Sequence, residues 1–377
     1  MINKRRLVRT FKKLVRIDSL SLHEGKMARY LQKELRALGI RSYQVGRVRG
    51  GEVGNIIAFV PGNGLNSPRM LVNAHIDTVS PGKKIKPVER KGHISSDGDT
   101  ILGADNKAGV AAILEILKII KEKKLKCPPL RIIFTVAEEI GIMGAKALPE
   151  KALNADIGLV LDGGDIDVII NKAPSQYNLT ATIIGRAAHA GIHPEEGVNA
   201  IKVASEAIAK MKIGRIDRET TSNIGVIKGG RATNIVPDEV ELKGEARSHN
   251  EKKLDRQVEQ MERTLMKACE KHRARLKLKV EEMYKSFEVS KKSKIMSLVI
   301  AGMKANGIKP LVKQTGGGSD ANIFNDWGIP TLILGVGADR VHTTREQLCV
   351  ADFIRGTENI LSIIKEAGSW KNFGKKK

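Results

Sequence analysis

The chain has 377 residues, of which 41% are hydrophobic and 28% are charged. A chain of this length and apolar content can bury more than one core, so we expect two globular domains and exclude a globally disordered protein. The longest apolar stretches, such as residues 108–120, fall short of the roughly 20 residues that a membrane-spanning helix needs, so we predict no transmembrane segment.

The formal net charge of the chain is +23, and a field of that sign attracts nucleic acids, anionic membranes and acidic ligands alike. However, many basic residues alternate with acids on expected helix faces, as in residues 251–275. Aromatic side chains, which would stack on bases, make up only 3% of the chain. We therefore do not expect nucleic acid as the main partner, and the sequence leaves the reason for the excess charge open.

The N-terminal residues 1–17 are rich in Arg and Lys, as in a transit peptide, but Leu7, Phe11, Leu14 and Val15 recur at helical spacing. We interpret the segment as an amphipathic first helix. Because it lacks the continuous apolar region of a secretory signal, we expect a cytoplasmic protein. Three widely spaced cysteines predict neither a disulfide framework nor a CxxC metal site: Cys127, Cys269 and Cys349.

Short apolar runs alternate with helical patterns in the first part of the chain, which predicts an α/β fold. We expect strands over residues 69–74, 130–136 and 157–161, and a helix over residues 106–121. Each of these strands is followed by residue types that bind metals. An α/β sheet places its ligands at such C-terminal strand ends.

The pattern changes after residue 173 and is then typical of a separate α+β unit. Its expected strands cover residues 177–184, 222–228, 239–246 and 275–282, and its expected helices cover residues 200–211 and 251–272. Apolar runs with strand-end chemistry then resume, as at residues 331–334. We therefore predict a discontinuous α/β catalytic domain of residues 1–173 and 285–377, with an inserted α+β domain of residues 174–284.

Polar residues at the separate strand ends form a constellation typical of a metal site. His75 and Asp77 are two apart in an extended segment and point to the same side, so Asp77 can hydrogen-bond the ring nitrogen that does not bind metal. Taken singly, each candidate has a plain explanation as a helix cap, a solvated acid or a turn residue. Together they supply two imidazoles and four carboxylates, with one acid left over, which suits two divalent ions about 3.5 to 4 Å apart. The candidates are His75, Asp105, Glu138, Glu139, Asp162 and His342.

As an ordered set, these motifs resemble the M20 family of metallopeptidases, and within it the peptidase T-like branch. The matching segments are residues 16–19, 24–25, 74–78, 103–109, 138–139, 161–163, 316–322 and 341–344. The resemblance implies a pair of zinc ions, one bound by His75 and Asp162, the other by Glu139 and His342, and both bridged by Asp105. It further implies that Glu138 is the general base and that Asp77 orients His75. Asn106 departs from the family pattern, in which a second acid often follows the bridging aspartate.

The implied activity is that of a tripeptidase-like aminopeptidase, which hydrolyses the N-terminal peptide bond of small peptides. A hydroxide that bridges the two metal ions attacks the amide carbonyl after Glu138 has taken its proton. Zinc suits the imidazole and carboxylate ligands, as do cobalt and manganese. Two alternatives stay open, namely an M20 deacylase or carboxypeptidase acting on N-acyl amino acids and, more remotely, a nucleic-acid-binding protein.

The inserted domain resembles the lid and dimerisation domain of the family. His189 resembles the lid histidine that stabilises the oxyanion, which in dimeric relatives comes from the neighbouring subunit, so we expect a homodimer through this domain. Asn234 and Arg247 resemble the lid positions that hold a substrate carboxylate. Gly317 and Gly318 lie in a glycine loop whose N–H groups either contact the substrate or simply allow a tight turn.

Overall fold

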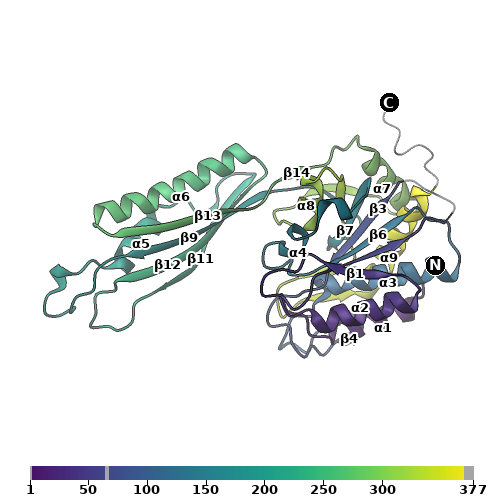
Figure 1. The fold of residues 1–377 in the computed structure, drawn as a ribbon, viewed down its shortest axis with the longest axis horizontal. Helices are drawn as coiled ribbons and strands as arrows, with labels where there is room; N and C mark the ends of the chain where they lie inside the picture. Colours follow the sequence, from purple (N-terminus) through teal and green to yellow (C-terminus); the bar gives the residue numbers. More distant parts are fainter. Residues whose placement is uncertain (1, 64–67, 369–377) are drawn as a thin grey trace. The chain divides into compact units, whose positions relative to one another are not determined.

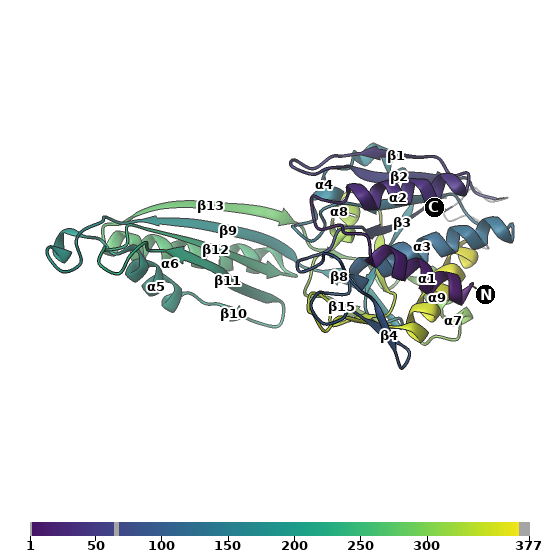
Figure 2. The same cartoon turned by 90° about the horizontal axis from the view of Figure 1, so that it is seen from below.

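A computed structural model describes residues 2–63 and 68–368, so residues 1, 64–67 and 369–377 of the predicted catalytic domain lie outside the described part. The chain has the predicted mixed α/β architecture and divides into two compact units (Figures 1 and 2). The first unit comprises the segment up to Asn171, residues 288–314 and the segment from Ser319 onward. The second comprises residues 172–287 and 315–318.

The glycine loop belongs to the second unit, whereas the domain bounds expected from the sequence place it in the catalytic domain. The backbone N–H of Thr315 donates to the carbonyl of Lys172 at 3.0 Å. Gly318 lies against the ring of Tyr284, since a Cβ atom at this position would be 2.2 Å from the ring carbon Cζ. These contacts tie the loop to residues far away along the chain, and no local pattern reveals them.

A mixed sheet forms the centre of the first unit, and its nine strands within the described residues run in the order β1-β2-β6-β3-β7-β16-β8-β14, with β15 paired to β8. The strands β6, β3, β7 and β16 are parallel neighbours, so their C-terminal ends meet at one edge of the sheet. The predicted strands are confirmed as β3, β6, β7 and β16. The bounds are β1 (Ser42–Val45), β2 (Asn55–Val60), β3 (Met70–His75), β6 (Leu130–Thr135), β7 (Ile157–Gly163), β8 (Val168–Ala173), β14 (Phe287–Glu288), β15 (Leu311–Gln314) and β16 (Thr331–Gly335).

The helices of the first unit pack around this sheet. Helix α3 (Ala104–Glu122) is buried along most of its length, and it contacts β3, β7, α1 (Lys4–Val15) and α9 (Val350–Ala367). The predicted amphipathic first helix is confirmed as α1, whose Phe11 meets Phe353 of α9 edge to face at a centroid distance of 5.5 Å. The other helices of this unit are α2 (Gly25–Ala37), α4 (Met143–Lys146), α7 (Lys294–Ala305) and α8 (Asp320–Asp326).

A smaller sheet of the first unit has the strand order β17-β18-β5-β4. Leu348 of β18 pairs with Ile94 of β5, and both side chains are buried. This sheet therefore joins the segment before α3 to the segment before α9. Its strands are β4 (Val88–Arg90), β5 (His93–Ser95), β17 (Ala338–Asp339) and β18 (Gln347–Cys349).

The second unit is a five-stranded antiparallel sheet in the order β10-β11-β12-β9-β13, with the helices α5 (Ala200–Lys210) and α6 (Glu251–Lys271) packed on it. The alternation of apolar residues along β9 and the helical spacing in α6 place Leu179, Leu254 and Leu265 in one buried core. The elements predicted for this region are all present. The strands are β9 (Ser175–Ile184), β10 (Gly214–Arg215), β11 (Thr220–Gly229), β12 (Glu239–Ser248) and β13 (Arg275–Tyr284).

The cysteines are all free thiols, of which Cys127 and Cys269 are buried and Cys349 is partly exposed. Burial raises the pKa of the Cys127 and Cys269 thiols, which makes them poor nucleophiles. None of the helices in the described ranges combines the length and the apolar character that crossing a bilayer demands.

Candidate metal centre

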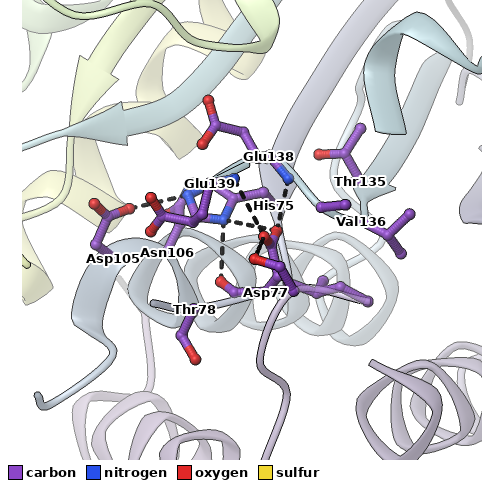
Figure 3. A network of polar contacts seen from close by, with 12 residues as sticks. His75, Asp77, Thr78, Asp105, Asn106, Thr135, Val136, Glu138 and Glu139 are labelled. Atoms are coloured by element: carbon purple, nitrogen blue, oxygen red, sulfur yellow. Dashed lines mark hydrogen bonds and ion pairs between the residues drawn. The ribbon is translucent and has the colours of Figure 1, made fainter. Parts of the chain in front are cut away.

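The centre is built at the C-terminal ends of the parallel strands of the first unit. His75 is the last residue of β3 and is only 2% exposed. Its Nδ1 atom lies 3.2 Å from the backbone oxygen of Asp77 and 3.4 Å from the carboxylate oxygen Oδ1 of the same residue. The ring is thereby held on one side, and Nε2 faces the carboxylate of Asp105 at 2.9 Å (Figure 3). The carboxylate of Asp162 lies 3.4 Å from the same nitrogen.

The two carboxylate oxygens of Asp105 face two different imidazoles. Oδ1 lies 2.9 Å from Nε2 of His75, and Oδ2 lies 3.3 Å from Nε2 of His342. The same nitrogen of His342 is 2.9 Å from a carboxylate oxygen of Glu139. Asp105 thus stands between two groups of predicted ligands, His75 with Asp162 and His342 with Glu139.

Two buried acids hold the turn that follows β6. The carboxylate of Asp77 accepts the backbone N–H groups of Glu138 and Glu139 at 3.0 and 3.2 Å. Glu24 accepts the N–H of Ala137 at 2.9 Å. Ala137 has a φ of 51°, which is uncommon for a residue with a side chain and indicates that the turn is held in place by its surroundings.

The role of Glu24 was not predicted. It lies in one of the segments that match the family, but nothing in its local pattern indicates that it reaches a turn 113 residues away. Burial raises the pKa of Glu24 to about 7, and repulsion from Asp77 adds to the shift. Two acids that support one turn therefore repel each other across it.

Burial and mutual repulsion dominate the electrostatics of the centre. Burial raises the pKa of Glu138 well above its usual value and that of Asp162 to about 7, and neighbouring carboxylates add to both shifts. Hydrogen bonds to Asp105 and Glu139 raise the pKa of His342 to about 10. Asp105 has a lowered pKa, because the hydrogen bonds from His342 and His75 outweigh its burial. A buried cluster of several carboxylates favours bound cations, because the cations would relieve the repulsion between the carboxylates.

Three of these side chains bring potential ligand atoms close together. His75, Asp105 and Glu139 each offer one ligand atom, and these atoms lie within 4.8 Å of one another. Asp162 and His342 extend the group through their contacts with His75 and Asp105. The first unit therefore brings all five predicted metal ligands together, with Asp77 and Glu138 beside them.

The remaining candidates lie in the second unit. His189 and Asn234 are exposed on neighbouring segments, which are joined by a hydrogen bond from the N–H of Ala190 to the carbonyl of Asn234 at 3.0 Å. Arg247 lies in β12, and its guanidinium donates two hydrogen bonds to the carboxylate of Glu245, both 2.9 Å long. Gly317 and Gly318 lie in the loop of residues 315–318. The pairing of Arg247 with an acid was not foreseen.

Comparisons with known proteins agree with the site. The family described as peptidase family M20/M25/M40 matches residues 71–366. The chain is 38% identical to the uncharacterised protein YqjE of Bacillus subtilis over 97% of this chain and 100% of that one. The structure of a tripeptidase from Staphylococcus aureus superposes with a TM-score of 0.92 at 37% identity, covering 98% of this chain and 100% of that one. Aminopeptidase PepT from Bacillus cereus gives a TM-score of 0.85 at 39% identity, covering 97% and 99%.

Proposed function

Because the chain belongs to peptidase family M20/M25/M40, and is thus a peptide hydrolase, we propose that it is a tripeptidase-like aminopeptidase with two divalent cations at its centre. The observation that carries the proposal is the position of Asp105, whose two carboxylate oxygens face His75 and His342. One carboxylate placed between two imidazoles is the arrangement that a ligand shared by two cations needs. The similarity to the tripeptidase from Staphylococcus aureus and to aminopeptidase PepT from Bacillus cereus supports the choice of substrate.

The side chains at the centre fit a pair of cations. Four carboxylates, those of Asp105, Glu138, Glu139 and Asp162, stand beside two imidazoles, and two divalent cations would balance their charge. In the proposed arrangement His75 and Asp162 would hold one zinc ion, Glu139 and His342 would hold the other, and Asp105 would be shared between them. Bound there, the cations would polarise the substrate carbonyl and lower the pKa of a water molecule.

Glu138 is the proposed general base. It is buried, and its backbone is fixed by Asp77, so its carboxylate is presented from a supported turn. In the proposed reaction this carboxylate takes a proton from the attacking water and later gives it to the leaving amine of the peptide. Because burial raises the pKa of Glu138, the group is suited to hold a proton between these two steps.

We further propose that the inserted domain, residues 174–284, binds the substrate and forms a homodimer. Strand β11 pairs along its length with β12, whereas β10 pairs only with Thr221 and Ser222 on the other side. The edge beyond Ser222 carries Ile227, which is 52% exposed, and an open edge of this kind favours pairing with a second copy. His189, Asn234 and Arg247 are the proposed contacts to the peptide.

A paired substrate assay tests the function. Purified protein is given zinc and then a free tripeptide or an N-acetyl amino acid, with and without a chelator. We expect hydrolysis of the tripeptide, release of its N-terminal residue and loss of activity with the chelator. Hydrolysis of the N-acetyl substrate alone would instead establish the deacylase alternative. Metal analysis of the protein as isolated identifies the ion, for which zinc is expected.

A further inference from the structure

Glu346 is a buried acid of the first unit that lies outside the set of proposed metal ligands. Both of its carboxylate oxygens accept hydrogen bonds from backbone N–H groups. Its Oε2 atom accepts the N–H groups of Leu102 and Gly103 at 2.8 and 2.7 Å. Its Oε1 atom accepts the N–H of Asp105 at 3.0 Å. The side chain of Glu346 has no exposed surface. Three hydrogen bonds to one carboxylate fix the backbone of residues 102–105.

The fixed segment precedes the regular part of α3. Gly103 has a φ of 71°, and Asp105 has a φ of −79° and a ψ of 105°, so the regular helical geometry of α3 starts only after this segment. Backbone N–H groups that are buried before a helix need an acceptor from elsewhere. Glu346 supplies that acceptor from a position 241 residues away from Asp105 in the sequence.

The acid lies four residues after His342, in the turn that carries this imidazole. The N–H of Glu346 donates to the carbonyl of Thr343 at 3.0 Å, which closes the turn. His342 has a φ of 62°, a conformation that is uncommon for a residue with a side chain and that the surroundings must maintain. Glu346 therefore joins the backbone that presents Asp105 to the backbone that presents His342.

A buried cation near the acid offsets its charge. Lys107 is fully buried, its Nζ atom donates to the carbonyl of Ile17 at 2.9 Å, and its charge is attracted by those of Asp18 and Glu346. A carboxylate without such compensation would be costly to bury. Burying the two charged side chains of Glu346 and Lys107 is costly even when they compensate each other, which indicates that Glu346 does more than fill space.

We propose that Glu346 is a positioning residue that holds Asp105 and His342 in their metal-binding arrangement before any cation is bound. The inference rests on the proposed metal centre. This role explains which segments Glu346 connects, since one segment carries the proposed ligand Asp105 and the other carries the proposed ligand His342. It also predicts that the shared ligand Asp105 loses its orientation when the link is cut, so that affinity for both cations falls.

The test compares three variants with the wild type. Glu346→Gln replaces one acceptor by an amide group, and Glu346→Asp shortens the side chain so that it cannot reach all three N–H groups. Glu115→Gln is the matched control, because Glu115 is also buried in the first unit but bonds to Asn3 and Arg6, away from the proposed ligands. Each protein is loaded with zinc and titrated with a competing chelator, and amide hydrogen exchange of residues 100–106 is followed in the metal-free proteins.

We expect both Glu346 variants to lose zinc affinity by about tenfold to a hundredfold, the range seen when a group that orients a metal ligand is removed. Exchange at residues 102–105 should become faster in the metal-free variants, while Glu115→Gln leaves both readouts as in the wild type. Wild-type affinity and exchange in Glu346→Gln would overturn the proposal, as would an equal loss of zinc in Glu115→Gln. If the wild type holds no zinc, the proposed two-cation function fails, and amide exchange still decides the role of Glu346.

Discussion

The carboxylate oxygen Oδ1 of Asp77 accepts the backbone N–H of Glu138 at 3.0 Å. The same oxygen lies 3.4 Å from Nδ1 of His75. One buried acid therefore supports both a proposed metal ligand and the turn that carries the proposed base. The sequence predicted only the contact with His75, because His75 and Asp77 are two residues apart, whereas the turn after β6 is distant in the chain.

We expect Asp77→Asn to impair the centre in two separable ways. The amide has one acceptor oxygen in place of two, so it cannot hold His75 and the N–H groups of Glu138 and Glu139 together. Zinc affinity should fall by about tenfold to a hundredfold. Turnover at saturating zinc should also fall, because the base is displaced, and this part distinguishes the variant from one that only weakens metal binding. Calorimetric zinc titration and kcat at excess zinc measure the two effects, and full activity at excess zinc would limit Asp77 to orienting His75.

Glu138→Ala should separate catalysis from metal binding. The variant keeps all five proposed ligands, so we expect it to retain two zinc ions per chain. Its kcat should fall by about 10²-fold to 10⁴-fold, the usual contribution of a positioned base. Glu139→Ala is the control, because it removes a proposed ligand and should reduce the zinc content. Near-normal turnover of Glu138→Ala with both ions bound would exclude Glu138 as the base.

The convergence of three proposed ligands was predictable from the sequence, because each of them lies near or just after the end of an apolar run. The strands β3, β6 and β7 are short, buried and bounded by polar residues, and parallel neighbours necessarily bring their C-terminal ends together. His75, Glu139 and Asp162 therefore converge once the strand order is set. The α+β unit could also be predicted from the sequence, since apolar residues alternate along β9 but recur at helical spacing along α6.

The supporting residues were not predictable, because their contacts span the chain without a local pattern. Glu24 and Glu346 act through backbone N–H groups, and a backbone amide leaves no trace in the sequence of the residue it belongs to. The antiparallel strand β8 was missed for a related reason. It is a short run with the polar residues Asn171 and Lys172 near its end, and only its pairing with strands distant in the sequence, such as β16, makes it part of the sheet.

The glycine loop offers a matched pair of substitutions that separates packing from substrate contact. A Cβ atom at Gly318 would meet the ring of Tyr284, whereas at Gly317 the nearest atom is Oγ1 of Thr315 at 3.8 Å. We expect Gly318→Ala to destabilise the protein by about 1–3 kcal/mol, the usual cost of overpacking. Gly317→Ala should leave the melting temperature unchanged, so a rise in its KM for a tripeptide would report contact with substrate. An unchanged KM in Gly317→Ala would leave the loop with a packing role alone.

The second unit contains an acid whose contribution to stability should depend on pH. Glu206 of α5 accepts contacts from Lys210 at 2.7 Å and, across to the end of α6, from Lys271 at 2.7 Å and His272 at 2.6 Å. The hydrogen bonds from His272, Lys210 and Lys271 lower the pKa of Glu206 from its ordinary value of 4.5. Since the folded state binds this proton less tightly than the unfolded state, the stabilisation is present above pH 4.5 and is lost as the pH falls below that value.

Glu206→Gln should therefore lower the melting temperature at pH 7, and the difference from the wild type should shrink when the melts are repeated at pH 3. Salt should shrink it as well, because the partners are close to solvent and their attraction is screened. Glu259→Gln is the control, since Glu259 forms an exposed pair with Arg263 at 3.8 Å and such pairs contribute little. A difference between Glu206→Gln and the wild type that is as large at pH 3 as at pH 7 would show that the substitution acts through packing and that the charge of Glu206 does not join α5 to α6.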